Sequence, residues 1–136
     1  MKFSSTRLAY ILSRLALSKK ASDIHMLDVR KLTEVTDYFV ICTANADLHG
    51  RAIADSLTQE MEKKKMRPLH KEGFQQGRWI LLDFVDVVVH IFLKEAREFY
   101  NLERLWGDAP RRILSQNGRF RANNGQTKTG IRRKKQ

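Results

Sequence analysis

Two short, almost purely apolar runs lie close together in the second half of the chain, at residues 79–82 and 87–92. They flank the acidic corner DFVD at residues 83–86, where aspartate side chains can bond the backbone two residues ahead. Apolar runs of this length around such a corner predict a buried β-hairpin. A loop made of these four residues would pair Leu82 with Val87.

The predicted hairpin has two different faces, because side chains alternate across a strand. One face is aliphatic throughout and consists of Ile80, Leu82, Val87, Val89 and Ile91. The other face is apolar with polar edges and consists of Trp79, Leu81, Asp83, Asp86, Val88, His90 and Phe92. We expect helices to pack on the aliphatic face, and we expect a partner to cover part of the other face.

Elsewhere the pattern alternates between helical and extended spacing. It predicts helices from Ser4 or Ser5 to about Lys20, from a cap at Asn45 or Asp47 to about Lys65, and over 94–100, then a turn at Asn101 and a short helix after it. It predicts strands over 24–29, 37–43 and, at a sheet edge, 67–71. With the hairpin, this gives an α/β fold of about five strands, and Pro110 is expected to end the ordered part.

Length and composition fit one domain with a modest core, since the chain has 136 residues and 42% hydrophobic residues. The single cysteine, Cys42, cannot form an intrachain disulfide, so we expect a reducing, cytoplasmic environment. No apolar run is long enough to span a membrane, so no membrane partner is expected. The basic N-terminus is interpreted as a first helix rather than a targeting peptide.

The net charge of +11 is concentrated at the C-terminus, where residues 111–136 hold nine basic residues and no acidic one. We therefore divide the chain into a folded domain, 1–112, and a basic tail, 113–136, expected to be disordered from residue 117. Such a tail is suited to nucleic acid or another polyanion. The tail cations expected to make this contact are Arg119, Arg121, Lys128, Arg132, Arg133, Lys134 and Lys135.

Motifs for catalysis or cofactor binding are missing, since the sequence has neither GxGxxG nor a Walker-type loop. Its histidines, His25, His49, His70 and His90, do not have the spacing of a zinc site. Asp83 and Asp86, with Asp28 or Asp37, are the best candidates for holding Mg²⁺. We favour the simpler interpretation that Asp83 and Asp86 cap the backbone of a turn. We therefore expect no cofactor, no metal and no enzymatic activity.

Four segments carry a resemblance to a known family: KKASDIHMLDVRKLTEVTDYFVICTA, RAIADSL, GRWILLDFVDVVVHIF and REFYNLERLWGDAP. In this order they resemble the Iojap family, whose bacterial members are called ribosomal silencing factors, over about residues 8–112. The resemblance implies a compact α/β domain with a mixed sheet, similar in topology to nucleotidyltransferases but without their catalytic signature. One departure is the turn at 45–50, where relatives usually have a Ser-rich helix start followed by basic residues.

The resemblance also implies a function. Family members bind the large ribosomal subunit through ribosomal protein L-fourteen, block joining of the small subunit and so repress translation when nutrients are short. Two alternatives remain, a factor for large-subunit assembly and a metal-dependent nucleotide-handling enzyme on a related fold. With a ribosomal partner implied, the polyanion expected to contact the basic tail is ribosomal RNA. Whether the free protein is a monomer or a homodimer stays open.

The polar-edged face of the hairpin is our candidate partner surface, because aromatic side chains contribute most where they fill a pocket of a partner. We expect Trp79 to be its anchor, with Leu81, Val88 and His90 beside it on the same face. Tyrosine and arginine are also favoured at interfaces. On that ground Tyr38, Arg97 and Tyr100 are expected to flank this surface, and the alternative is that each makes a structural hydrogen bond instead.

Overall fold

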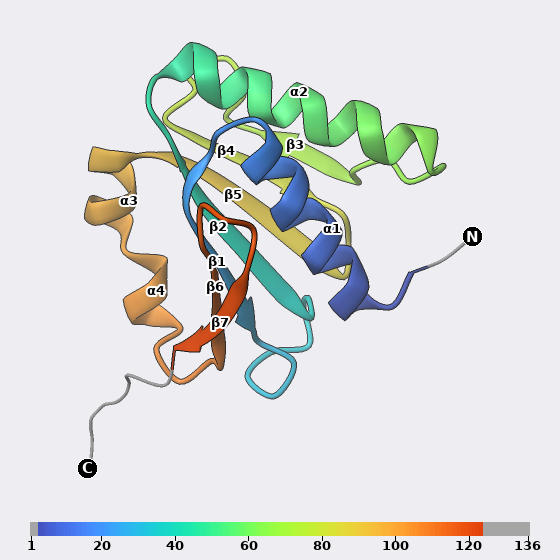
Figure 1. Ribbon diagram of the computed structural model, residues 1–136, viewed down its shortest axis with the longest axis vertical. Helices are drawn as coiled ribbons and strands as arrows, with labels where there is room; N and C mark the ends of the chain where they lie inside the picture. Colours follow the sequence, from blue (N-terminus) through green and yellow to red (C-terminus); the bar gives the residue numbers. More distant parts are fainter. Residues whose placement is uncertain (1–2, 124–136) are drawn as a thin grey trace.

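The computed structural model describes residues 3–123 (Figure 1). In chain order its elements are α1 (Ser5–Ser18), β1 (Ser22–Asp28), β2 (Tyr38–Ala44), α2 (Asp47–Lys63), β3 (His70–Glu72), β4 (Trp79–Asp83), β5 (Val87–Leu93), α3 (Lys94–Tyr100), α4 (Leu102–Leu105), β6 (Arg111–Leu114) and β7 (Phe120–Asn123). The predicted helices and strands up to α4 are all present, with ends displaced by a few residues. None of the helices between residues 3 and 123 is long and apolar enough to cross a membrane.

The strands form one mixed sheet in the order β3-β4-β5-β2-β1-β6-β7. β2 and β5 run parallel at its centre, and every other neighbouring pair is antiparallel. The sheet has seven strands rather than about five, because β6 and β7 extend it beyond β1. The α/β class, the single domain and the mixed sheet are thus as predicted.

Helices cover the two faces of the sheet unequally. α1 and α2 lie together on one face and bury the larger core against it (Figure 1). The aliphatic hairpin residues Ile80, Leu82, Val87, Val89 and Ile91 all belong to this core and are fully buried. α3 and α4 lie on the opposite face over a smaller core that includes Leu27, Ile41 and Phe92. The two faces of the hairpin are therefore as predicted.

The register of the hairpin differs from the predicted one by two residues. Asp83 pairs with Val88 and Trp79 with Phe92, so the loop contains residues 84–87 rather than 83–86. The reason lies in Phe84, whose side chain turns into the larger core, while Asp83 accepts a hydrogen bond from the backbone of Val85. A displacement by two leaves each side chain on its face, because the period of a strand is two.

The end of the ordered part lies later than predicted. Residues 111–123 form an antiparallel hairpin whose first strand pairs with β1, so the predicted boundary at 112 falls inside β6. Leu114 is buried in the larger core and Phe120 packs against it. The expectation of disorder from residue 117 is therefore wrong for residues 117–123. Arg119 and Arg121 belong to this hairpin, whereas Lys128, Arg132, Arg133, Lys134 and Lys135 lie outside the described residues.

The start of α2 is held differently from the predicted cap. Ala46 is its N-cap, without a side-chain hydrogen bond to the first turn. His49 instead accepts a hydrogen bond on Nδ1 from the backbone N–H of Asn45, at 3.0 Å. Its Nε2 donates to the carbonyl of Lys19 at 2.7 Å. His49 thus joins the start of α2 to the end of α1, and the atypical turn at 45–50 has a structural role.

Candidate partner-binding surface

The sheet face that carries α3 and α4 also carries the predicted partner residues of the hairpin. Trp79 projects from β4 and lies half-buried among aromatic side chains, with ring centroids 4.9 Å from Phe92 and 4.6 Å from Tyr100. Leu81 follows on the same strand and face, paired with His90 of β5. Trp79, Leu81, Val88 and His90 therefore share one face, as the alternation of the two strands predicted.

His90 is the buried polar centre of this aromatic cluster. Its side chain accepts a hydrogen bond on Nδ1 from the indole Nε1 of Trp79, at 3.0 Å. Burial lowers the pKa of the imidazole to about 4, so His90 is neutral at pH 7 and carries its proton on Nε2. Nε2 has no hydrogen-bond partner among the described residues. His90 therefore supports Trp79 from within rather than offering a contact to a partner.

The short helices α3 and α4 present large apolar side chains to solvent. Phe99 is 79% exposed, Leu105 73% and Tyr100 48%. Ala96 faces the opposite way, into the smaller core, together with Leu102. Tyr100 and Phe99 continue the Trp79 cluster outwards, because Tyr100 contacts Trp79 on one side and Phe99 on the other, with centroids 5.0 Å apart in the second pair. Exposed apolar side chains that gather in this way are typical of an interaction surface.

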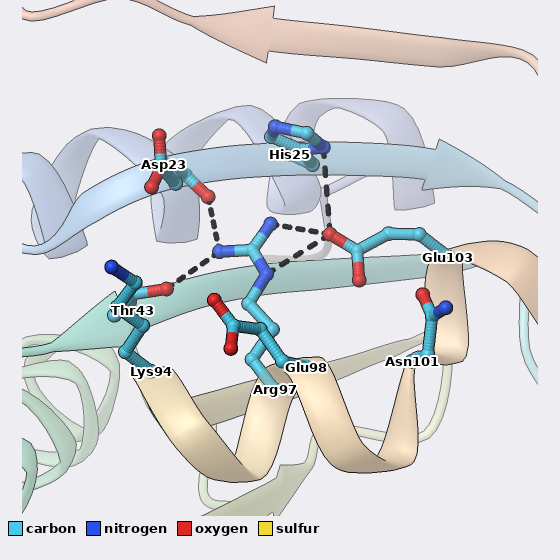
Figure 2. Close-up of a pocket in the computed structure, with 8 residues that line it drawn as sticks. All are labelled: Asp23, His25, Thr43, Lys94, Arg97, Glu98, Asn101 and Glu103. Carbon is cyan, nitrogen blue, oxygen red and sulfur yellow. Dashed lines mark hydrogen bonds and ion pairs between the residues drawn. The ribbon is translucent and has the colours of Figure 1, made fainter.

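Arg97 fixes this pair of helices to the sheet (Figure 2). Its Nε donates to Glu103 of α4 at 2.9 Å, and its Nη2 bonds the same carboxylate oxygen. Its Nη1 donates to the carbonyl of Asp23 at 2.7 Å and to the hydroxyl of Thr43 at 2.8 Å. The guanidinium thus joins α3, α4, β1 and β2. Because both charged side chains are largely buried, this contact orients the surface and is itself hidden from a partner.

Burial and the charge of Arg97 together set the pKa values of the ionisable side chains next to it. Burial raises the pKa of Glu103, but the hydrogen bonds and charge of Arg97 outweigh this and leave the pKa below its ordinary value. Burial and the nearby Arg97 lower the pKa of His25 to about 4. His25 Nδ1 lies 3.7 Å from the Glu103 carboxylate, which is too long for a hydrogen bond, and has no other partner among residues 3–123. At neutral pH the pocket of Figure 2 therefore holds one strong ion pair and a neutral histidine.

Tyr38 lies on the other side of the sheet, apart from the remaining predicted residues. It is 3% exposed and its hydroxyl forms a 2.7 Å hydrogen bond with Thr6 of α1. The guanidinium of Arg30 covers its ring, 5.2 Å from the centroid, and Arg30 is paired with Asp28. The structure thus places Trp79 and Tyr100 together on one face of the sheet and Tyr38 on the opposite face.

Phe99 and Leu105 are the residues that sequence reasoning missed on this surface. Their signal was present, since each is a large apolar residue in a short helix whose inward positions are already filled by Ala96 and Leu102. The segment is too short for a helical period to show which positions face inwards.

Two of the carboxylates considered for a metal, those of Asp83 and Asp28, are engaged in other contacts. Asp83 accepts a hydrogen bond on Oδ1 from the backbone of its own turn at 2.8 Å, as the simpler interpretation predicted, whereas among residues 3–123 the side chain of Asp86 makes no such bond. Asp28 forms two hydrogen bonds with the guanidinium of Arg30, which hold the pKa of this carboxyl below its usual range. Across residues 3–123, no group of three or more histidine, cysteine or acidic side chains is arranged to hold a metal ion.

Comparison with known proteins gives a consistent result. The family model described as "Ribosomal silencing factor during starvation" matches residues 2–136. The chain belongs to the ribosomal silencing factor family. It is similar to ribosomal silencing factor RsfS of Bacillus subtilis, with 46% identity over 92 residues, covering 68% of this chain and 78% of the relative. It is also 40% identical over 101 residues to chloroplastic protein Iojap of Zea mays, covering 74% of this chain and 44% of that longer protein.

Solved structures agree with the fold of this ribosomal silencing factor family member. A crystal structure of a protein from Chromobacterium violaceum superposes with a TM-score of 0.75 at 28% sequence identity, covering 77% of this chain and 88% of the other. One from Bacillus halodurans superposes with a TM-score of 0.68 at 35% identity, covering 74% and 94% of the two chains. The predicted resemblance to the Iojap family is therefore confirmed.

Proposed function

We propose that this protein is a non-enzymatic silencing factor that binds the large ribosomal subunit through ribosomal protein L-fourteen. Bound there, it blocks joining of the small subunit and represses translation under nutrient limitation. Membership in the ribosomal silencing factor family supports the proposal. The cytoplasm, where ribosomal subunits meet, is the proposed location.

The surface formed by Trp79, Phe99, Tyr100 and Leu105 is the proposed contact with the ribosomal protein, and its exposure is the observation that carries the proposal. Aromatic side chains are enriched where protein interfaces gain most of their energy. Phe99 is 79% exposed although it is a large apolar side chain, so burying it against a partner is favourable. The surface is also rigid, since Arg97 ties both helices to the sheet, and a rigid surface loses less entropy on binding.

Sedimentation with separated ribosomal subunits tests this proposal. The protein should sediment with large subunits and not with small ones. It should also slow subunit joining, followed by light scattering, in proportion to the fraction of large subunits bound. A protein that sediments with neither subunit would contradict the proposed function.

A pair of matched variants tests the surface. Phe99→Ser should weaken large-subunit binding by roughly 2 kcal/mol, the scale of an interface hot spot. Val35→Ser is the control, since Val35 is 83% exposed and belongs to the loop between β1 and β2 rather than to α3 or α4. Both changes replace an exposed side chain and should leave the free energy of unfolding nearly unchanged. Equal binding by the two variants would show that α3 does not contact the subunit.

A second candidate function is assistance in large-subunit assembly. The observation that favours it is a relative in Mus musculus named "Mitochondrial assembly of ribosomal large subunit protein 1", 35% identical over 99 residues. The two functions separate in a depletion experiment. Loss of a silencing factor should raise translation in starved cells with normal large subunits, whereas loss of an assembly factor should accumulate incomplete large subunits in growing cells.

A further inference from the structure

Acidic residues are confined to the middle of the sequence, and both ends carry only basic charges. All fifteen acidic residues lie between Asp23 and Asp108. The first 22 residues hold five basic residues and no acidic one, and the last 26 hold nine basic residues and no acidic one. Two acid-free segments thus begin and end the sequence. If they met in the fold, they would form a surface without local counter-charges.

The fold brings these segments together. The ring of Tyr10 in α1 contacts the ring of Phe120 in β7 edge to face, with centroids 4.7 Å apart. Arg14 of α1 donates a hydrogen bond to the carbonyl of Gly118, between β6 and β7, at 2.9 Å. One corner of the molecule is therefore built from α1 and the β6–β7 hairpin, which are about a hundred residues apart in the sequence.

Three arginines of this corner are held on aromatic rings. Arg14 lies over Phe120 at 5.2 Å from the ring centroid, and Arg112 of β6 lies over Tyr10 at 5.8 Å. Arg7 shares the face of α1 with Tyr10 and Arg14, at helical spacing, and lies over Phe3 at 5.8 Å. Stacking on a ring orients a guanidinium while leaving most of its N–H donors free.

None of Arg7, Arg14 and Arg112 forms an ion pair within residues 3–123. Some arginines elsewhere in the fold are paired, such as Arg30 with Asp28 and Arg97 with Glu103, whereas others such as Arg104 are not paired within the described part of the chain, so what sets the corner apart is three unpaired arginines held on aromatic rings. The corner therefore offers three oriented cations, none of which has a carboxylate within 4 Å among residues 3–123.

We propose that this corner of Arg7, Arg14 and Arg112, with Tyr10 and Phe120, is a binding surface for the phosphate backbone of RNA. Guanidinium groups bind phosphate through paired hydrogen bonds, and phosphate neutralises the uncompensated charge. A lipid surface fits less well, because none of the strongly exposed large apolar residues of the described chain lies in α1, β6 or β7. The inference deepens the proposed function and depends on it only in identifying the RNA as ribosomal.

Two triple variants of the full-length protein with equal net charge test the surface. Arg7→Gln/Arg14→Gln/Arg112→Gln removes the three cations of the corner. Lys63→Gln/Arg67→Gln/Lys71→Gln removes three cations near β3, at the opposite edge of the sheet from β7. The probe is a fluorescein-labelled RNA duplex about 16 base pairs long. Binding is followed by fluorescence anisotropy from about 50 to 200 mM salt, and thermal unfolding confirms that both variants fold.

The corner variant should lose affinity at low salt, and the slope of log affinity against log salt should fall by about 2 to 3, the contribution of three phosphate contacts. The control variant should keep a slope within about 1 of the unmodified protein. Equal losses in both variants would overturn the inference, because affinity would then follow total charge. An unchanged affinity of the corner variant would overturn it as well.

A third variant separates oriented arginines from charge alone. Phe120→Leu keeps an apolar contact with Tyr10 but removes the ring beneath Arg14, so the charge is unchanged. Affinity for the duplex should fall about two- to fivefold, the worth of one exposed cation–π contact. An affinity equal to that of the unmodified protein would show that the ring does not position Arg14 for RNA.

Sedimentation with large ribosomal subunits makes the two proposals separable. If the corner variant binds the RNA duplex normally but large subunits weakly, the corner contacts an acidic protein and the RNA inference is overturned. If the unmodified protein binds the duplex as expected but does not sediment with large subunits, the RNA surface stands and the proposed function fails. Weaker binding of the corner variant to both the duplex and large subunits supports the RNA surface and the proposed function together.

Discussion

The indole nitrogen of Trp79 donates a hydrogen bond to Nδ1 of His90 across the β4–β5 pair, at 3.0 Å. This bond needs a neutral imidazole, because a protonated histidine has no acceptor on Nδ1. The half-buried aromatic cluster beneath the proposed partner surface is therefore sensitive to the protonation of one buried histidine. His90 is 4% exposed, and burial lowers its pKa from 6.5 to about 4.

Stability should consequently fall between pH 6.5 and pH 4. In this range the unfolded chain takes up a proton on His90 and the folded protein does not, so acid favours unfolding. Above pH 6.5 and below pH 4 the folded and unfolded states carry the same charge on His90. In these ranges His90 no longer makes the free energy of unfolding depend on pH. The decrease in the free energy of unfolding should be on the order of 2–3 kcal/mol, measured by urea unfolding across this range.

His90→Asn is the matched control for this effect. Asparagine places an acceptor oxygen near the position of Nδ1 and does not titrate, so the Trp79 hydrogen bond can persist. The variant should have a flatter dependence of stability on pH, with the remaining slope due to His25, whose pKa is lowered to about 4 as well, and towards pH 4 to carboxyls with a lowered pKa such as Glu103 and Asp28. A pH profile identical to that of the unmodified protein would show that His90 titrates normally.

Arg97 should contribute more to stability than an ordinary surface ion pair. Arg97→Met leaves the Glu103 carboxylate largely buried without its partner, so the free energy of unfolding should fall by about 3 kcal/mol. The double variant Arg97→Met/Glu103→Met removes both charges and should be more stable than the single variant. Urea unfolding of the three proteins measures this difference. A double variant less stable than Arg97→Met would contradict the interpretation of Arg97 and Glu103 as a coupled pair.

Opposite faces of the hairpin should respond differently to truncation. Val89→Ala removes two methyl groups from the fully buried face beneath α1 and α2, and should cost roughly 1–3 kcal/mol of stability. The affinity of the folded variant for large subunits should not change. Trp79→Ala should reduce both the stability and the affinity of the folded protein for large subunits. Binding is compared at a temperature where both variants remain folded. If Trp79→Ala lowers binding no more than its reduced stability explains, Trp79 is a core residue and not an anchor.

The faces of the hairpin could be predicted because the alternation of Ile80, Leu82, Val89 and Ile91 survives the two-residue error in register. The register itself could not, since it depends on Phe84 turning into the core. Tyr38 shows a second limit. β2 lies at the centre of the sheet with helices on both sides, so apolar residues on both of its faces hide which way Tyr38 points.

The C-terminal hairpin was missed for a related reason. Among residues 111–123, Ile113, Leu114 and Phe120 are the only large apolar side chains, which is too few to show a period. They are stabilised by tertiary contacts, Leu114 by the larger core and Phe120 by Tyr10, and these contacts are invisible in a local pattern. Trp79 and Tyr100 enter the proposed partner surface from strand alternation and residue type alone. Its extension to Phe99 and Leu105 required the packing of α3 and α4.

Two truncations separate the C-terminal hairpin from the basic residues beyond it. Removing 124–136 takes away five cations, and removing 117–136 also takes away β7 with Phe120. The longer deletion should be less stable, and the difference in free energy of unfolding measures what β7 contributes. The shorter deletion should reduce the salt dependence of large-subunit binding by about 0.7 to 0.9 for each phosphate that the protein no longer binds. It should still sediment with large rather than small subunits, because the proposed recognition lies on α3 and β4. If removing 124–136 abolished that preference, the basic tail would be the recognition element and the assignment of the α3–α4 surface would be wrong.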